Sequence, residues 1–575
     1  MAKEINFMVG GEAGQGVQTV GFVLAKTLAR AGLNVFADQD YESRVRGGHN
    51  FYRVRASDVS VQAISERLDV LIAIDQQSIE RHHTELKEGG VAIFDHDRLN
   101  SEGKKLNSLS IPLQKLAEET TSNKLMTNTV GVGAAVAVGG FDFEILADVM
   151  KGHFEHLGKE MVVANIKAAR AGYDHARNGS PQLIRSPISP APGGNKKMLL
   201  NGNEAIALGA MAAGCKFISA YPMTPASTIM EYMVDNGKDL NVVVIQPEDE
   251  IAAMNMAVGA GYAGVRAMTA TSGDGFALMT EGMGLAGITE TPVVIAIAQR
   301  PGPAVGLPTR TEQGELQLAV YGASGEFPKA VLAPATIEDA FYVTVRAFNL
   351  AEKYQIPVII MTDQHLASSY QTVEKFKLAE IKIDRGQLVT EEQSNDGTDY
   401  KRHRFTESGV SPRALPLQGK ALVVTDSDEH DEAGHMIEDA ALRTQMMLKR
   451  LKKYDGLRAD IAKPIFEKKD AAAITLVGWG TTYGPIAEAA KMLAEEGTNV
   501  NVLHLNEVWP LATESVISAL GDGTKSVVIE NNATAQMAHL IAAETGIKVG
   551  STILKFDGRP FTPEYIVGQL KKEVL

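Results

Sequence analysis

Residues 5–32, INFMVGGEAGQGVQTVGFVLAKTLARAG, show the pattern from which we expect most of this protein to be built. The stretch opens with an apolar run, passes through a segment rich in glycine, and continues with apolar side chains at helical spacing up to Gly32. An apolar strand that turns tightly into an amphipathic helix is the first half of a β–α–β crossover. The stretch therefore predicts an α/β domain with a parallel sheet.

The same alternation of strands and helices recurs along the chain, which predicts an α/β fold made of several parallel-sheet domains. Strands are predicted at 34–40, 68–75 and 90–95, then at 216–220, 241–246, 265–271, 291–299 and 355–363, and finally at 472–480, 499–506, 526–531 and 548–558. The stretch 180–197 holds four prolines and two glycines, which predicts a linker. We divide the chain into a first domain (1–185), this linker (186–197), a second domain (198–370), an irregular excursion (371–468) and a third domain (469–575).

Composition excludes several classes of function. The 575 residues carry a net charge of −14 without a basic stripe, which argues against a nucleic-acid partner. The one cysteine, Cys215, cannot ligate an iron–sulfur cluster. The N-terminus lacks the layout of a signal peptide, and no apolar run approaches the ~18–20 residues that span a bilayer. We expect a cytoplasmic protein with no membrane contact.

Two glycine loops invite interpretation. In GGEAGQGVQT (10–19), the lysine of a phosphate-binding P-loop and the third glycine of a dinucleotide fingerprint are both missing. The loop is either a purely structural turn or a helix start that contacts a phosphorylated ligand. In TSGDGFALM (271–279), Gly273-Asp274-Gly275 resembles the opening of the metal–pyrophosphate motif of thiamine diphosphate enzymes. The closing asparagine pair is absent there, since Asn531-Asn532 lies in another domain, so we expect no metal site on this chain.

The run SAYPMTPAST (219–228) is the strongest local signal for a site. Thr224 followed by Pro225 predicts a helix start, with the threonine as N-cap and the proline at the first helical position. Free N–H groups at that end favour a small anion such as a carboxylate, although a well-capped helix without a ligand would look the same.

Charged residues follow two other strands of the same predicted sheet. Glu248 and Glu250 come after the strand at 241–246, and Arg300 comes after the strand at 291–299. Each feature also has a simpler explanation. Acidic residues in a first helical turn can serve only to offset the helix dipole, and Arg300 considered alone could be a surface cation. Since loops after parallel strands meet at one edge of the sheet, the combination predicts a site for an acidic substrate.

At this point the chain resembles the 2-oxoacid:ferredoxin oxidoreductases, specifically the fused gamma–alpha large subunit, and most closely the alpha subunit of the 2-oxoglutarate enzymes. The resemblance covers nearly all of the sequence. It rests on GGEAGQG, RVRGGHNFYRVR, GNEAIALGAMAAGCKFISAYPMTPAST, EDEIAAMNMAVGAGYAGVRAMTATSGDGFALMTE, QRPGPAVGLPTRTEQGEL, SDEHDEAGHMIED, LNEVWPL and KFDGRPFTPEYI. It implies a pyrimidine-binding type of thiamine domain in the middle, a transketolase C-terminal-like domain at the end and a gamma-type domain at the start.

The resemblance also implies roles for single residues. Glu250 matches the glutamate that hydrogen-bonds the aminopyrimidine of thiamine, with Glu248 as the weaker candidate. Thr224 and Arg300 match the positions that clamp the 2-oxoacid carboxylate, for which the arginine fork is suited. The remaining matches are the substrate and coenzyme A wall at Tyr221, Pro222 and Pro225, and the thiamine-pocket loop at Thr271, Ser272 and Gly273. A distal substrate carboxylate would need another cation, for which Arg310 and a lysine on the beta subunit are both candidates.

Partners follow from the same resemblance. Thiamine diphosphate would be shared with a beta subunit that holds Mg²⁺ and a [4Fe-4S] cluster, in an (αβ)₂ heterotetramer. Coenzyme A would be the co-substrate and ferredoxin the electron acceptor. We expect oxidative decarboxylation of 2-oxoglutarate to succinyl-CoA and CO₂, or the reverse reaction that fixes CO₂ in a reductive TCA cycle.

Alternatives remain open from the sequence. The substrate could be pyruvate or a broad range of 2-oxoacids, and the chain could be a scaffold whose partner does the catalysis. A nicotinamide dehydrogenase is disfavoured by the failed glycine fingerprint. His430 and His435 lie among acids, where we expect a solvated loop rather than a metal site, and the pair His82-His83 is expected to face solvent on a helix.

Overall fold

The computed structural model describes residues 3–43, 47–102, 106–191, 196–395, 400–521 and 523–574. Part of the predicted linker, 192–195, and the RVR of RVRGGHNFYRVR, 44–46, lie outside these ranges. The chain forms two compact units. Unit 1 comprises Met1–Asn201, Ser368–Lys375 and Thr562–Tyr565, and unit 2 comprises Gly202–Ala367, Phe376–Phe561 and Ile566–Leu575. Each unit is described by itself.

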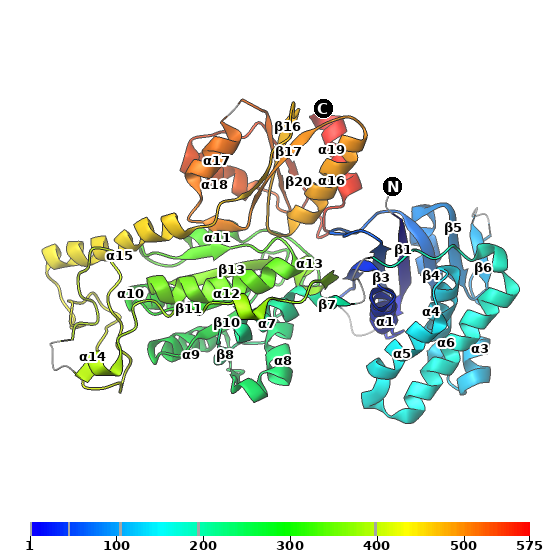
Figure 1. Ribbon diagram of the computed structural model, residues 1–575, viewed down its shortest axis with the longest axis horizontal. Coiled ribbons are helices and arrows are strands. Elements are labelled where there is room, and N and C mark those ends of the chain that lie inside the picture. The colour runs from blue at the N-terminus through cyan, green and yellow to red at the C-terminus, as the bar shows by residue number, and fades with distance from the viewer. Residues whose placement is uncertain are drawn as a thin grey trace. The chain divides into compact units, whose positions relative to one another are not determined.

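Unit 1 is built on a sheet of eight strands in the order β6-β5-β4-β1-β3-β2-β14-β7 (Figure 1). The bounds are β1 (Glu4–Ala13), β2 (Asn34–Asp40), β3 (Gly47–Ser57), β4 (Leu68–Ala73), β5 (Leu86–Phe94), β6 (Asn107–Ser110), β7 (Met198–Asn201) and β14 (Tyr370–Val373). Strands β1, β4, β5 and β6 are parallel, as predicted. The prediction of a wholly parallel sheet is wrong for the other half, because β3 pairs antiparallel with both β1 and β2.

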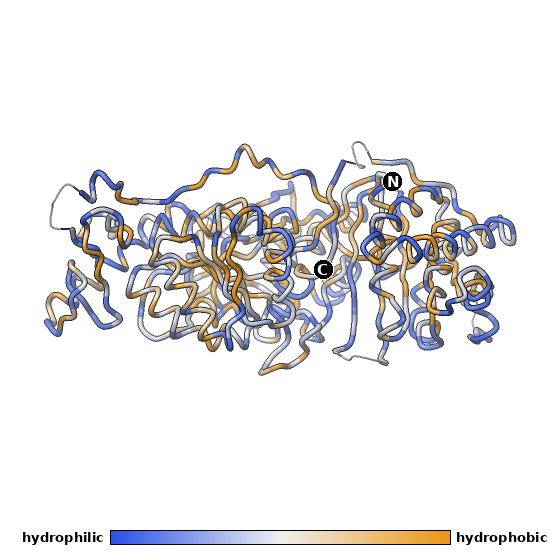
Figure 2. Tube along the Cα trace, turned by 90° about the horizontal axis from the view of Figure 1, so that it is seen from below, coloured by the Kyte–Doolittle hydropathy of each residue, from blue (hydrophilic) through white to orange (hydrophobic). Residues whose placement is uncertain are grey.

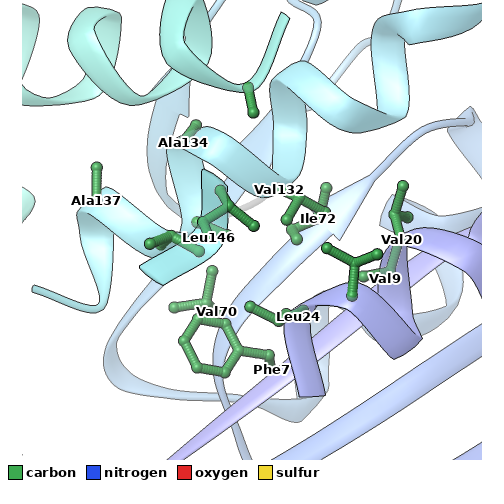
Figure 3. Close-up of a cluster of buried hydrophobic side chains, with 14 of the residues drawn as sticks. Phe7, Val9, Val20, Leu24, Val70, Ile72, Val132, Ala134, Ala137 and Leu146 are labelled. Atoms are coloured by element: carbon green, nitrogen blue, oxygen red, sulfur yellow. The ribbon is translucent and has the colours of Figure 1, made fainter. Parts of the chain in front are cut away.

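The core of unit 1 lies between this sheet and its helices. These are α1 (Val17–Arg30), α2 (Gln76–His82), α3 (Leu113–Thr121), α4 (Thr127–Val138), α5 (Phe143–Phe154) and α6 (Lys159–Gly179). Figure 3 shows Phe7, Val70 and Ile72 of the strands meeting Leu24 of α1 and Val132 of α4. Every residue of α4 is buried, which is why its sequence is apolar all round.

Unit 2 contains two sheets. The larger has the order β18-β12-β13-β11-β10-β8-β9 and is parallel except for the edge strand β18. Its strands are β8 (Phe217–Ser219), β9 (Val243–Ile245), β10 (Ala267–Thr271), β11 (Val293–Gln299), β12 (Ala330–Leu332), β13 (Pro357–Asp363) and β18 (Glu507–Trp509). The helices between them are α7 (Gly202–Ala212), α8 (Ser227–Asn236), α9 (Glu250–Tyr262), α10 (Gly273–Ile288), α11 (Leu316–Tyr321), α12 (Ile337–Tyr354) and α13 (Gln364–Ser368).

The second sheet of unit 2 has the order β15-β17-β16-β19-β20, with β15 antiparallel and the rest parallel. Its strands are β15 (Ile465–Glu467), β16 (Ile474–Trp479), β17 (Val500–Leu505), β19 (Ser526–Glu530) and β20 (Ser551–Leu554). Its helices are α16 (Tyr483–Glu495), α17 (Thr513–Leu520), α18 (Gln536–Thr545) and α19 (Pro563–Glu573), whose first residues belong to unit 1. One hydrophobic cluster includes residues from both sheets, for example Ile295 of β11 and Trp479 of β16.

Hydrophobic residues gather largely in the interior of each unit, while the outer loops are hydrophilic (Figure 2). The three sheets, mostly parallel and covered by helices, confirm the predicted α/β class. No helix within the described ranges combines the length and apolar character needed to cross a bilayer.

The segment predicted to be irregular contains one long helix, α15 (Ala440–Asp460), and a short one, α14 (Glu391–Asn395). A buried ionic cluster attaches this segment to the sheet domain. Glu290 pairs with Lys449 and Lys453 of α15 at 2.5 Å each, and the Nδ1 atom of His403 lies 2.9 Å from the same carboxylate. Although burial alone would raise it, the two lysines hold the pKa of Glu290 well below its ordinary value.

His430 belongs to the same cluster, so the expectation of a solvated loop is wrong for this residue. Its ring is fully buried and lies against His403, with 4.0 Å between ring centroids. Burial lowers the pKa of His430. The His435 side chain, in contrast, is 68% exposed, as a surface loop requires.

Candidate active site

The predicted site residues of unit 2 gather where the central parallel strands end. Strand β8 leads into the run 219–228, β9 into α9, β10 into α10 and β11 into the loop that begins at Arg300. The carboxyl edge of a parallel sheet is where ligands bind in such folds, because the following loops and helix starts meet there.

The helix that follows the run SAYPMTPAST begins later than predicted. Helix α8 begins at Ser227, with Ala226 as its N-cap and no side-chain capping bond, so Thr224 is not the cap. The reason is a turn ahead of the helix, in which the Met223 carbonyl accepts hydrogen bonds from the N–H groups of both Ala226 and Ser227. The Thr224 side chain is left exposed at the edge of the sheet.

A residue that the sequence did not single out holds this turn. The Nδ2 atom of Asn203, at the start of α7, donates to the carbonyl of Pro225 at 2.7 Å and to the Thr228 hydroxyl at 2.6 Å. Asn203 is buried, as is Pro225, whereas Tyr221 and Pro222 are exposed and so available to a ligand.

The TSGDG loop touches the same run. The hydroxyl of Ser272, which is the N-cap residue of α10, donates to the Met223 sulfur at 2.6 Å, and the Thr271 hydroxyl lies 3.9 Å from that sulfur. Gly273 opens the helix directly after Ser272. The structure therefore brings the two predicted loops together.

Glu250 is the first residue of α9 and points inward. Asp249 is the N-cap and accepts from the N–H of Ala252, while Glu248 is exposed. The Glu250 side chain lies against Gly275, since a Cβ placed there would be 2.8 Å from Glu250 Oε1. Glu250 is 4% exposed, and its buried Oε1 has no hydrogen-bond partner among the described residues. A buried carboxylate oxygen without a donor is costly, which indicates that a ligand supplies the donor.

Arg300 is buried rather than a surface cation. Its Nη1 donates to the Thr224 carbonyl and its Nη2 to Asp274 Oδ2, both at 2.7 Å, while its buried Nε has no partner in the described part of the chain. Two of the five N–H groups of this guanidinium are thus committed to protein. The prediction placed Arg300 and Thr224 on one rim, and the structure joins them by a hydrogen bond.

Glu315 is a third charged residue at the start of α10, and the sequence gave no reason to choose it. A Cβ on Gly273 would lie 2.4 Å from Glu315 Oε1, so the two residues are in contact. Burial raises the pKa of Glu315 to about 8, helped by the carboxylates of Glu312 and Asp274 and opposed by Arg300. Each residue of the Gly-Asp-Gly triplet therefore meets a charged side chain: Glu315, Arg300 and Glu250 in turn.

The loop that carries Glu315 is held by the third predicted domain. Gln313 exchanges backbone and side-chain hydrogen bonds with Asn531, and its carbonyl accepts from Asn532 Nδ2 at 3.1 Å. Gln313 Nε2 also donates to the carbonyl of Trp479 at 2.9 Å. The asparagine pair that seemed unrelated to the TSGDG loop thus fixes the loop packed against it.

Arg310 lies ten residues beyond Arg300 in the same connection. Its side chain packs beside Gly558, where a Cβ would be 3.1 Å from Arg310 Cβ, and its Nη1 donates to the Thr309 carbonyl at 3.3 Å.

The glycine loop of unit 1 forms a tight turn, with φ of 92° at Gly14 and 72° at Gly16. Asn128 holds it by donating to the Gln15 carbonyl at 2.7 Å, and a Cβ on Gly16 would collide with that amide. These contacts explain the glycines structurally and leave ligand contact as a prediction.

His82, expected on a polar helix face, is buried instead. Its Nε2 lies 2.7 Å from His49 Nε2, and its Nδ1 lies 2.7 Å from Glu85. Burial, and secondarily the neighbouring His82, lower the pKa of His49 to about 4.

The residues present fit one half of a thiamine diphosphate site. Glu250 offers a buried, unpartnered carboxylate oxygen, which suits a nitrogen heterocycle, and the Thr271–Gly273 turn lies beside it. The described residues offer no group of three or more acids, histidines or cysteines placed to bind a metal ion.

Comparisons with known proteins bear on this geometry. A family model described as pyruvate flavodoxin/ferredoxin oxidoreductase, thiamine diphosphate-binding, matches residues 208–449. A model described as pyruvate ferredoxin/flavodoxin oxidoreductase matches 6–175, and the transketolase C-terminal domain matches 466–550. These matches confirm the predicted kinds of domain.

Individual relatives match nearly all or about two thirds of the chain. The alpha subunit of a 2-oxoacid:ferredoxin oxidoreductase from Sulfolobus sp is 32% identical over 99% of this chain and 97% of its own length. The 2-oxoglutarate synthase subunit KorA of Methanothermobacter thermautotrophicus is 33% identical over 66% of this chain and 99% of its own.

A solved structure agrees with both. The 2-oxoglutarate:ferredoxin oxidoreductase from Magnetococcus marinus, with 2-oxoglutarate, coenzyme A and succinyl-CoA bound, matches over 100% of both chains with a TM-score of 0.92 and 32% identity. Full-length sequence matches, three domain models and the fold point the same way. The chain belongs to the alpha subunits of the 2-oxoacid:ferredoxin oxidoreductases.

Proposed function

We propose that this chain is the alpha subunit of an enzyme that oxidatively decarboxylates 2-oxoglutarate with coenzyme A, giving succinyl-CoA, CO₂ and reduced ferredoxin, or that runs the reaction in reverse. The observation that carries the proposal is the meeting of Glu250, Thr224 and Arg300 at the start of α10. Support for the substrate comes from the Magnetococcus marinus enzyme, which matches over the full chain. The five segments predicted from the sequence are kept as the proposed division into domains.

Glu250 would hold thiamine diphosphate through its buried Oε1, with Thr271, Ser272 and Gly273 forming the adjacent wall. When bound, the cofactor supplies the carbon nucleophile that a 2-oxoacid needs in order to lose its carboxylate. The Oε1 atom of Glu250 is shielded from solvent, and shielding strengthens its electrostatic effect on a bound group.

Arg300 would bind the 2-oxoacid carboxylate. Its guanidinium is pinned by the Thr224 carbonyl and by Asp274, so the direction of its remaining N–H groups is fixed before substrate arrives. Thr224 would add a hydroxyl from the exposed side of the run, and Tyr221, Pro222 and Pro225 would form the wall toward coenzyme A. A fixed fork orients a planar carboxylate better than a mobile ammonium could.

The other half of the site would come from a beta subunit. That subunit would hold the Mg²⁺–pyrophosphate and a [4Fe-4S] cluster, pass electrons to ferredoxin, and assemble with this chain as (αβ)₂. The name of each alpha-subunit relative supports a partner chain. The exposed apolar residues Ile251 and Met256 on α9 and Leu278 on α10 support a protein surface close to Glu250.

Broad 2-oxoacid specificity is the second candidate, because the full-length sequence relatives carry the general name 2-oxoacid:ferredoxin oxidoreductase. The two candidates differ in the need for a cation that pairs with the distal carboxylate of 2-oxoglutarate. We propose Arg310 for this role.

The experiment is the reduction of a low-potential acceptor by the chain co-expressed with its beta subunit, with coenzyme A and thiamine diphosphate, on 2-oxoglutarate or pyruvate. Activity on 2-oxoglutarate that is lost in Glu250→Ala supports the proposal. Equal activity on pyruvate favours broad 2-oxoacid specificity. If Glu250→Ala kept full activity, this chain would be a scaffold without a catalytic role. Glu248→Ala, at the exposed neighbouring position, is the matched control.

Substrate preference is tested in the same assay with Arg310→Ala. If Arg310 pairs with the distal carboxylate, the KM for 2-oxoglutarate rises while the KM for pyruvate stays unchanged. An equal change for both substrates would remove Arg310 from the site.

A further inference from the structure

The start of α10 brings a partly buried carboxyl, that of Glu315, close to Arg300, and the proposed reaction does not use it. Glu315 contacts Gly273, one residue before the Asp274 that pairs with Arg300. Its Oε2 is shielded from solvent and has no hydrogen-bond partner in the described ranges. A carboxyl with one such oxygen is a poor place for a negative charge, since neither water nor a donor stabilises Oε2.

We propose that Glu315 is a positioning residue of this site, which carries a proton when the 2-oxoacid binds and so leaves Arg300 available to the substrate carboxylate. This inference rests on the proposed function, because it concerns the same carboxylate.

The charges around Arg300 show why the proton matters. Arg300 is paired with Asp274, so the two together are neutral before substrate arrives. The remaining carboxyls near Glu315 are those of Glu312 and Asp274, and Arg300 is the cation that faces it. An ionised Glu315 would give this group of side chains a net negative charge and compete with the incoming carboxylate for Arg300. A neutral Glu315 removes both penalties.

The position of Glu315 is imposed from outside the loop. Its own N–H donates to Gln299 Oε1 at 3.1 Å, beside Arg300 in sequence. On the other side, Gln313 is fixed by Asn531, Asn532 and Trp479, and Gln536 Nε2 donates to the Gly314 carbonyl at 2.7 Å. With Gln313, Gly314 and Glu315 all held by hydrogen bonds, the loop resists a movement that would turn Glu315 out to water to relieve an ionised form.

The electrostatic environment agrees with this geometry. Burial is the main cause that raises the pKa of Glu315 to about 8, and Glu312 and Asp274 raise it further. At neutral pH the side chain is therefore mostly a carboxylic acid, and above about pH 8 it becomes a carboxylate.

The test uses the complete complex with its beta subunit and compares the parent with Glu315→Gln, a neutral side chain of the same shape. The KM for the 2-oxoacid is measured from about pH 7 to about pH 9, either side of the raised pKa. In the parent, KM should rise by up to about tenfold per pH unit above the pKa, while kcat stays within about threefold. In Glu315→Gln the rise should be absent. Glu281→Gln, an exposed position on α10, should behave as the parent.

A second readout does not depend on turnover. Infrared difference spectra of the complex, titrated without substrate, should show a carboxylic-acid carbonyl band that disappears above about pH 8 in the parent and is missing in Glu315→Gln. Glu312→Gln should move the loss of this band to lower pH, because one of the two carboxylates that raise the pKa is gone.

The outcomes separate the two proposals. A parent KM that stays flat, or a rise that persists in Glu315→Gln, would overturn the role of Glu315, as would an infrared band missing at neutral pH. If no 2-oxoacid is turned over by the parent, the proposed function fails, and the infrared titration still reports whether Glu315 holds its proton.

Discussion

At the scale of single residues, this site is organised by a three-residue turn. Gly273, Asp274 and Gly275 each admit one charged partner, and the two glycines are needed because a side chain at either would collide with a glutamate. The sequence predicted Glu250 and Arg300, since both follow parallel strands. It could not predict Glu315, whose position depends on Gln313 and on asparagines more than two hundred residues away.

Replacing Arg300 tests whether its guanidinium group, with its several N–H donors, is needed for substrate binding. Arg300→Lys keeps the charge but cannot satisfy the Thr224 carbonyl, Asp274 and a substrate carboxylate at once. Loss of a charged hydrogen bond of about 1.5–3 kcal/mol predicts a fall of roughly 10- to 150-fold in kcat/KM for the 2-oxoacid. Steady-state kinetics of the complex measure it, with the exposed Arg30→Lys as control. A fall below twofold would mean that Arg300 does not contact substrate.

Glu315 also makes stability depend on pH. Its pKa is about 8 in the folded chain against 4.5 ordinarily, so between these values the folded state binds the extra proton. The free energy of unfolding should then decrease as pH rises through this window, by at most about 1.4 kcal/mol per pH unit. Glu315→Gln should unfold at a higher temperature than the parent above pH 8 and lose that advantage near pH 4.5. Equal melting temperatures at alkaline pH would contradict the buried proton.

At the scale of elements, the sequence predicted most strands but not their partners. Apolar runs at 216–220, 265–271 and 291–299 became β8, β10 and β11 because a strand buried on both faces must be continuously apolar. β3 was missed although its buried and open positions alternate, and it turns half of the first sheet antiparallel. Short strands such as β7, β14 and β18 carry too few residues for a pattern, and their pairing is set by tertiary contacts.

The crossing of α4 and α6 offers a test of packing. A Cβ on Gly172 of α6 would lie 1.9 Å from the Val130 carbonyl of α4, so the helices approach closely only because the residue is glycine. Gly172→Ala should destabilise unit 1 by about 1–3 kcal/mol or more, seen as a lower melting temperature. Gly152→Ala in α5 meets nothing within 4 Å and should instead stabilise by about 0.5–1 kcal/mol. Similar effects at both positions would refute the close crossing.

At the scale of the whole molecule, buried charges attach the 400–460 segment to the sheet of unit 2. Glu290 pairs with Lys449 and Lys453 of α15, so ions attach the helix in addition to its buried Met446 and Leu457. The sequence could not show this, because the three residues are ordinary surface types and lie some 160 positions apart.

Removing the shared carboxylate should detach that segment. Glu290→Gln leaves two buried lysines without a counter-charge, and the expected loss is about 3–5 kcal/mol in the free energy of unfolding. Denaturant unfolding measures it, and limited proteolysis should show earlier cleavage between residues 400 and 440. The exposed Glu326→Gln serves as control. Unchanged stability would mean that the lysines are neutral in the folded chain.

The pairing of β14 with β2 and β7 has a consequence for biosynthesis. The first two hundred residues of the chain leave the ribosome with the free edge of β2 exposed, since the strand that covers it is encoded at Tyr370–Val373. An uncovered edge is a template for pairing with other chains. Until translation has passed this point, the nascent N-terminal unit therefore needs protection, and a gene split between the two units would have to supply that strand anew.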